Sequence, residues 1–242
     1  MKQIVLHTLH LSVFSALLLV PMTLCLNPVS AERAPEQRDR LIRVLEETTP
    51  LVQPFSFLDL GRRHYDIVRR YASLYGLDYR LVLAIIKQES EFDQNALSER
   101  GAQGYMQIMP FTRDEIADEL EMSNADLPQG NLHAGIYYLA KLYGMFEGFR
   151  EDDRLNFTIA AYNAGPGRIY DAQELAGFIG EDPTRWKSIQ KVLPLLSKRY
   201  YSLHRLVWEK SRPRSGYFGA WKQTTDYVEN VRKTYQSYRK ML

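Results

Sequence analysis

Apolar side chains recur at helical spacing along most of the chain beyond its first quarter. In residues 79–91, for example, Leu81, Val82 and Ile85 fall on one side of a helix, and Asp78 stands where an N-cap is expected. The alternation of apolar and polar residues that marks a half-buried strand is scarce. The pattern therefore predicts a mostly helical protein, with helices over residues 65–75, 79–91, 112–120, 131–146, 155–163, 182–201 and 225–241.

Glycine, proline and asparagine mark the boundaries of these helices. Gly101 and Gly104 flank a loop, and Pro110 is placed to open the helix that follows it. The run Gly165-Pro166-Gly167 is predicted to end the helix before it. Asn131 is predicted to cap the start of its own helix. The sequence thus describes short helices joined by loops, with no internal repeat.

Residues 1–31 have the features of an export signal. Lys2 gives a basic start, residues 11–20 form an apolar core too short to span a bilayer comfortably, and Ala31 ends a small-residue cleavage site. Two alternatives remain open, a lipid on Cys25 and an uncleaved membrane anchor. In each case the protein is predicted to work outside the cytoplasm, in the periplasm.

Composition changes this picture mainly by exclusion. The chain of 242 residues is 45% apolar and 25% charged, which is ordinary for a globular protein. Its 31 basic and 29 acidic residues leave a net charge of +2, too small a field to favour nucleic-acid binding. The single cysteine lies in the predicted signal, and His64, His133 and His204 lack metal-ligand spacing. We therefore expect no disulfide, no thiolate chemistry and no metal site.

Glu89 is the residue whose position suggests chemistry. At about 100° per residue it falls within the apolar arc of its helix, whereas Glu91 falls on the opposite side. A carboxyl desolvated among apolar side chains favours its protonated form, and its pKa can rise to about 6. A general acid that works near neutral pH needs such a shift. A structural ion pair or a hydrogen-bonded helix end would also account for a buried glutamate.

Four motifs that follow in order favour the catalytic interpretation. They are residues 88–92 (QESEF), 96–98 (ALS), 101–110 (GAQGYMQIMP) and 160–167 (AAYNAGPG). Together they resemble the catalytic core of the soluble-type (SLT) lytic transglycosylases. The tail, with its YVENV run at residues 227–231, is similar to the C-terminal part of the membrane-bound lytic murein transglycosylase F group within that family.

The resemblance implies a mostly α, lysozyme-like (α+β) fold. It implies a catalytic domain over residues 65–180, preceded by an arm at 32–64 and followed by a helical extension at 181–242 that packs on it. It also implies a site in which Glu89 is the single catalytic acid and base. The substrate-binding residues that it implies are Ser98, Gln107, Met109, Tyr162, Asn163 and Tyr227.

Each of these residues also has a structural interpretation. Ser98 is suited to a turn, Met109 to a core, and Asn163 to satisfying backbone groups at a helix end. The chain departs from the family at Tyr105, where leucine is usual, and at Gln223, where glutamate is frequent. Tyr217, Trp221 and Tyr227 are the tail aromatics that we expect nearest the groove.

In this family the glutamic acid protonates the bond between N-acetylmuramic acid and N-acetylglucosamine. The muramic acid's own C6 hydroxyl then attacks and closes a 1,6-anhydro ring, so that one carboxylate suffices where most glycosidases need two. The partner would be a peptidoglycan strand, met by a monomer without cofactor, and basic stretches in the tail would suit the anionic wall or a membrane surface. A muramidase that uses water and a non-catalytic peptidoglycan-binding or scaffold protein are the alternatives.

Overall fold

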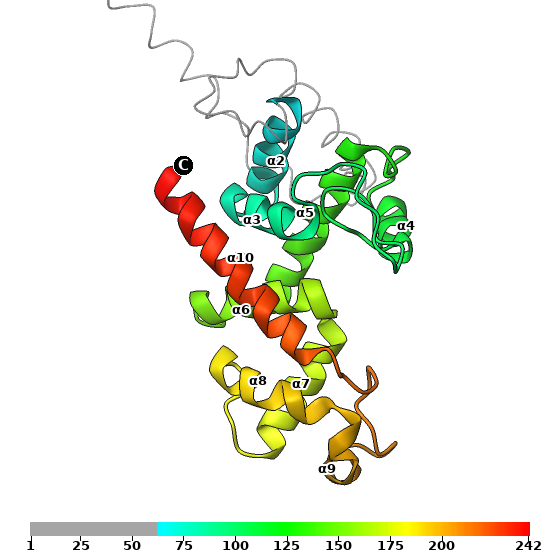
Figure 1. Ribbon diagram of the computed structural model, residues 1–242, viewed down its shortest axis with the longest axis vertical. Coiled ribbons are helices and arrows are strands. Elements are labelled where there is room, and N and C mark those ends of the chain that lie inside the picture. Colours follow the sequence, from blue (N-terminus) through cyan, green and yellow to red (C-terminus); the bar gives the residue numbers. More distant parts are fainter. Residues whose placement is uncertain (1–61) are drawn as a thin grey trace, which may run out of the picture. The chain divides into compact units, whose positions relative to one another are not determined.

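The computed structural model describes residues 62–242 and consists mostly of helices (Figure 1). The predicted export signal and the arm up to residue 61 lie outside the described residues. The helices are α2 (Arg62–Leu74), α3 (Tyr79–Ser90), α4 (Pro110–Glu119), α5 (Pro128–Met145), α6 (Glu151–Ala164), α7 (Pro166–Phe178), α8 (Trp186–Val192), α9 (Tyr201–Val207) and α10 (Trp221–Met241), with 3₁₀ turns η2 (Leu193–Leu196) and η3 (Lys198–Tyr200).

Helix α3 lies at the centre of the core, as its apolar face predicts. Asp78 caps it, since its carboxylate accepts a hydrogen bond from the backbone N–H of Arg80 at 2.9 Å. Six consecutive residues from Leu81 to Ile86 are buried, so the helix is covered on most sides in its middle. The chain then leaves the helix sharply, because Glu91 and Phe92 both adopt left-handed backbone conformations.

Helix α10 packs along α3 and α6 (Figure 1). Tyr227, Val228, Val231 and Tyr235 recur at helical spacing on its buried face. The hydroxyl of Tyr235 donates a hydrogen bond of 2.9 Å to the capping carboxylate of Asp78. The C-terminal helix therefore belongs to the same hydrophobic core as the helix that carries Glu89.

The structure differs from the predicted helices in two places. Gly165, with φ of 85°, ends α6 as expected, but Pro166 immediately opens α7, which was not predicted. A proline after a glycine serves equally well as a stop and as a first helical residue. The helix predicted over 182–201 is instead divided into α8, η2 and η3, with Pro194 at the break.

The loop between α3 and α4 contains the only strand pairing in the described part of the chain. Gln103 forms isolated antiparallel bridges with Leu97 and with Ile108. Asn131 holds this loop: its Oδ1 accepts from the backbone N–H of Met106 at 3.0 Å, and its Nδ2 donates to the Gln103 carbonyl at 2.8 Å. The prediction that Asn131 caps α5 was wrong, because the helix already begins at Pro128.

Candidate active site

The carboxyl group of Glu89 lies at the C-terminal end of α3, where that helix meets α10. Its Oε1 accepts a hydrogen bond of 2.6 Å from the hydroxyl of Tyr227, which is itself buried. Burial raises the pKa of Glu89 to about 7, and the hydrogen bond from Tyr227 partly opposes that rise. A group with this pKa exists in both protonation states near neutral pH, as a residue acting first as acid and then as base requires.

Two tyrosines lie close to this carboxyl group. Burial, followed by the charge of Glu89, raises the pKa of the Tyr162 and Tyr227 hydroxyls well above the ordinary value. Both therefore remain hydrogen-bond donors at any physiological pH. Tyr227 donates to Glu89, whereas Tyr162 donates to the Met106 carbonyl at 2.7 Å and so fixes the loop beside the site.

The neighbouring carboxylate, Glu91, points away from the site. Its side chain is 82% exposed and lies 3.7 Å from the ammonium of Lys87. Within the described residues, the pKa of Glu89 is shifted by burial and by Tyr227, and no second acidic side chain contributes to the shift. The pKa of Glu89 is thus raised without the help of a neighbouring carboxylate.

Ser98 and Gln107 both hold the loop that adjoins Glu89. The Oγ of Ser98 accepts a hydrogen bond of 2.9 Å from the backbone N–H of Ala102. Ser98 therefore stabilises a turn, as its residue type suggested. The Nε2 of Gln107 donates to the carbonyls of Ala96 and Gly104 at 2.9 and 3.0 Å. Gln107 has a left-handed backbone with φ of 46°, so its side chain secures a conformation that is unfavourable for a residue with a Cβ atom.

Met109 and Asn163 belong to different elements of the fold. Met109 precedes α4 and is 42% exposed, so it does not fill the core. Asn163 lies near the end of α6, and its Oδ1 accepts a hydrogen bond of 2.7 Å from the hydroxyl of Thr224 on α10. Asn163 thus helps to dock the helix that carries Tyr227.

The structure adds one residue that sequence reasoning missed and explains one departure. The Oγ of Ser90 donates to the Tyr105 carbonyl at 2.8 Å, tying the end of α3 to the loop. The ring of Tyr105, where the family usually has leucine, is buried, and its hydroxyl lies 3.0 Å from Nδ1 of His64. The tyrosine therefore fills the interior and does not extend a surface for sugars. The serine directly after Glu89 was visible in the sequence, but its partner was not.

The other two tail aromatics lie elsewhere in the tail than Tyr227. Tyr217 is 38% exposed, with its ring 5.6 Å from that of His204, and Trp221 begins α10. In the described part of the chain, no group of three or more histidine, cysteine and acidic side chains is arranged to hold a metal ion. Among the same residues, no helix has the length and apolar character needed to cross a bilayer.

The site thus consists of a partly buried glutamate at the end of α3 that is hydrogen-bonded to a tyrosine from the C-terminal helix. Residues 66–182 match the family model of the transglycosylase SLT domain, and this part of the chain belongs to that family. The match begins within α2 and ends just beyond α7.

Curated relatives of similar sequence carry transglycosylase names. The chain is 34% identical over 172 residues to a membrane-bound lytic murein transglycosylase F of Desulfosudis oleivorans, covering 66% of this chain and 37% of that protein. It is 32% identical over 205 residues to the protein of the same name in Mannheimia succiniciproducens, covering 80% and 39%. The chain thus spans well under half the length of these relatives.

A solved structure supports the fold. The 70 kDa soluble lytic transglycosylase Slt70 of Escherichia coli superposes with a TM-score of 0.52 and 24% identity, over 84% of this chain and 26% of that one. At this identity the similarity establishes the architecture alone. The expectation of a mostly helical, SLT-type fold is therefore confirmed.

Proposed function

We propose that the chain is a peptidoglycan lytic transglycosylase that cleaves the β-1,4 bond between N-acetylmuramic acid and N-acetylglucosamine. The observation that carries this proposal is Glu89 itself, a carboxyl group with a pKa of about 7 that is hydrogen-bonded to Tyr227 inside an SLT domain. The names of the curated relatives, which describe murein transglycosylases, support the same substrate.

In the first step, protonated Glu89 gives its proton to the glycosidic oxygen as the bond from C1 of the muramic acid to that oxygen breaks. Raising the pKa of Glu89 to about 7 keeps much of the acid form available at neutral pH. The positive charge that develops at C1 is stabilised by the substrate's own acetamido group. The N-acetylglucosamine leaves with a free hydroxyl.

In the second step, Glu89 acts as the base. Its carboxylate takes the proton from the C6 hydroxyl of the muramic acid, the C6 oxygen bonds to C1, and a 1,6-anhydro ring closes. Glu89 is protonated again at the end of the cycle. The reaction therefore consumes no water and needs no second carboxylate. The Tyr227 hydroxyl stabilises the carboxylate between the two steps, because it remains protonated and donates to Oε1.

The remaining site residues divide into two groups in this proposal. Met109, which is exposed, offers an apolar contact to a sugar ring. The Nε2 of Gln107 is used within the loop, so we assign its side-chain oxygen, Oε1, to a hydrogen bond with the substrate. Ser98, Tyr162 and Asn163 act by holding the loop and α10 in place. We further propose that residues 65–180 form the catalytic domain and that residues 181–242 complete its site.

The proposal is tested by Glu89→Gln. Gln is nearly isosteric and can still accept from Tyr227, but it can neither give nor take the proton, so the rate should fall at least about 10³-fold while glycan binding survives. The measurement is release of soluble muropeptides from purified sacculi. Digestion by Glu89→Gln at the wild-type rate would refute the assignment.

Glu91→Gln is the matched control, since it makes the same change two residues away on an exposed side chain. It should remain within a few-fold of wild type. Mass spectrometry of the products separates the alternatives: 1,6-anhydro ends support the transglycosylase, and reducing ends support a muramidase. Binding of sacculi without any soluble product would favour the non-catalytic scaffold.

We also propose that the protein acts in the periplasm as a monomer and associates peripherally with the membrane surface, with a lipid or membrane anchor as the alternative. The relatives' names describe membrane-bound proteins. Fractionation of cells, with the wall-bound, membrane and soluble fractions probed separately, tests this location.

A further inference from the structure

A polar cavity of about 250 Å³ is lined in part by the loop that holds Gln107. Its walls come from that loop, from α4, from the segment before α5 and from the start of α5. Volumes for drug-sized ligands begin at about 300 Å³, so this cavity suits a single small polar group and not a disaccharide. Its lining is Gln94, Asn95, Ala96, Leu97, Gln103, Gly104, Arg113, Ala125, Asp126, Pro128 and Asn131.

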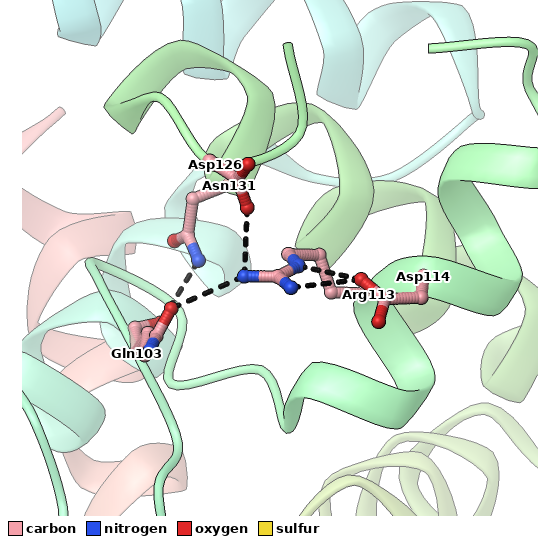
Figure 2. Close-up of polar contacts among 5 residues, drawn as sticks. All are labelled: Gln103, Arg113, Asp114, Asp126 and Asn131. Atoms are coloured by element: carbon pink, nitrogen blue, oxygen red, sulfur yellow. Dashed lines mark hydrogen bonds and ion pairs between the residues drawn. The ribbon is translucent and has the colours of Figure 1, made fainter. Parts of the chain in front are cut away.

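Arg113 is one of the residues that line this cavity, and its guanidinium lies at the centre of a cluster of polar contacts (Figure 2). One of its nitrogens, Nη1, lies 2.8 Å from a carboxylate oxygen of Asp126 and donates to the side-chain oxygen of Gln103 at 3.2 Å. Its other edge donates to Asp114 at 2.9 and 2.8 Å. The Arg113 side chain is only 19% exposed, whereas that of Asp126 is 80% exposed. The positive group is therefore held in the wall, whereas the side chain of Asp126 lies mostly in solvent.

The walls around this ion pair are close-packed. A Cβ atom at Gly104 would lie 2.6 Å from Cγ of Asn131, and one at Gly130 would lie 2.0 Å from the Asn124 carbonyl oxygen. Only glycine allows these approaches. Asn131 in turn donates to the Gln103 carbonyl, which fixes the residue that faces Arg113 (Figure 2).

An exchange of ion pairs follows from this arrangement. A ligand that carries a carboxylate and an ammonium on one carbon can give its carboxylate to Arg113 and its ammonium to Asp126. The number of compensated charges is unchanged, so the rotation of exposed Asp126 is the main cost. A ligand with a single charge makes only one of these two contacts: an ammonium alone takes Asp126 from Arg113, which then keeps only Asp114, and a carboxylate alone leaves Asp126 to solvent.

We propose that this cavity binds a free α-amino-acid centre, of the kind that the diamino acid of a peptide stem presents when it is not cross-linked. The inference deepens the proposed function, on which it rests, by adding a stem-recognition site to a glycan-cleaving enzyme. Two residues link the cavity to the loop beside Glu89. Ala96 and Gly104 line the cavity, and their carbonyls accept hydrogen bonds from the Gln107 side chain. Occupancy of the cavity is thereby coupled to the loop that adjoins Glu89.

The test is direct binding of soluble peptides to the full chain, measured by calorimetry. The probe is the stem tripeptide that ends in meso-diaminopimelate, and the matched ligand has lysine there, which keeps the ammonium and lacks the carboxylate. The diaminopimelate peptide should bind at least about tenfold more tightly. Equal affinity, or no binding of either peptide at millimolar concentration, overturns the proposal.

Asp126→Asn is the informative variant, because the exposed side chain can be changed without disturbing the core. It should remove the preference for the diaminopimelate peptide. Asp114→Asn is the matched control: it removes another carboxylate paired with Arg113 but lies outside the cavity lining, and it should keep the preference within twofold. If Asp126→Asn retains the preference, or if both variants lose it equally, the site is wrong.

This experiment does not depend on turnover. A wild-type chain that binds the tripeptide but leaves sacculi intact would refute the proposed function and keep the site. A chain that digests sacculi but binds neither peptide would do the reverse.

Discussion

Glu89 and Tyr227 are 138 positions apart in the chain, yet a 2.6 Å hydrogen bond joins them. The partial burial of Glu89 could be predicted from its own helix, because the apolar arc of residues 81–92 is a local property of the sequence. The contact with Tyr227 could not, because no local pattern shows how a helix near the C-terminus will pack. Only the family resemblance placed Tyr227 near the site, and it suggested a contact with substrate.

The effect of Tyr227 on the pKa of Glu89 can be tested by Tyr227→Phe. The hydroxyl favours the ionised form of Glu89, so its loss should raise the pKa of Glu89 above about 7. Because the free enzyme must carry a protonated Glu89, kcat/KM falls as the pH rises through that pKa. This descending limb should therefore move to higher pH, and kcat should fall about tenfold with the loss of a charge-assisted hydrogen bond.

Tyr235→Phe is the control for that profile. It makes the same change on the same helix, but its hydroxyl donates to Asp78 at the other end of α3. It should lower stability without moving the descending limb. A limb that stays in place in Tyr227→Phe, measured from pH 5 to pH 9 on purified glycan strands, would mean that Tyr227 does not control the ionisation of Glu89.

At the scale of elements, the sequence predicted the helices well and the loop poorly. Asp78 was predicted as the cap of α3 and is its cap, since the capping signal lies within one turn of the helix. Asn131 was assigned to the same role and instead bonds to Gln103 and Met106, more than twenty residues away. An asparagine near a helix start has the same local signature in both cases, and tertiary contacts decide between them.

The loop offers a test of that tertiary contact. Gly104→Ala places a Cβ atom 2.6 Å from Cγ of Asn131, at a residue with φ of 74°. It should destabilise the protein by about 2 to 3 kcal/mol, from backbone strain and from displacement of Asn131. Gly101→Ala is the control, because φ is 86° but a Cβ atom there meets nothing within 4 Å, so it should cost about 1 kcal/mol.

Urea unfolding monitored by circular dichroism measures both values. We also expect Gly104→Ala to lose activity, because Asn131 holds the segment that carries Gln107. If the two alanine variants were equally stable and equally active, the contact between Gly104 and Asn131 would not organise the loop.

For the whole molecule, the main question is whether the tail is a part of the enzyme or an appendage. Its helices contribute Trp186, Ile189, Leu196 and Val231 to the same hydrophobic core as α3. Polar contacts cross the same boundary: the backbone N–H of Trp186 donates to Asp153 at 2.9 Å. The sequence predicted that the apolar faces of the tail would need a partner, but it could not say that the tail would supply the hydrogen bond to Glu89.

Truncation after Gly180 tests this architecture. The shortened chain loses the cover of α6 and α7 together with Tyr227, so it should melt at a lower temperature and cleave glycan strands poorly although Glu89 is unchanged. Removal of Met241 and Leu242 alone is the control, because Met241 is 63% exposed and the contact of Tyr235 with Asp78 remains. Thermal melting and glycan turnover should be measured together, with turnover assayed below the melting temperature of each form. A chain ending at Gly180 that melts and turns over like the full protein would show that the tail is a separate appendage, and that the proposed site functions without its C-terminal tyrosine.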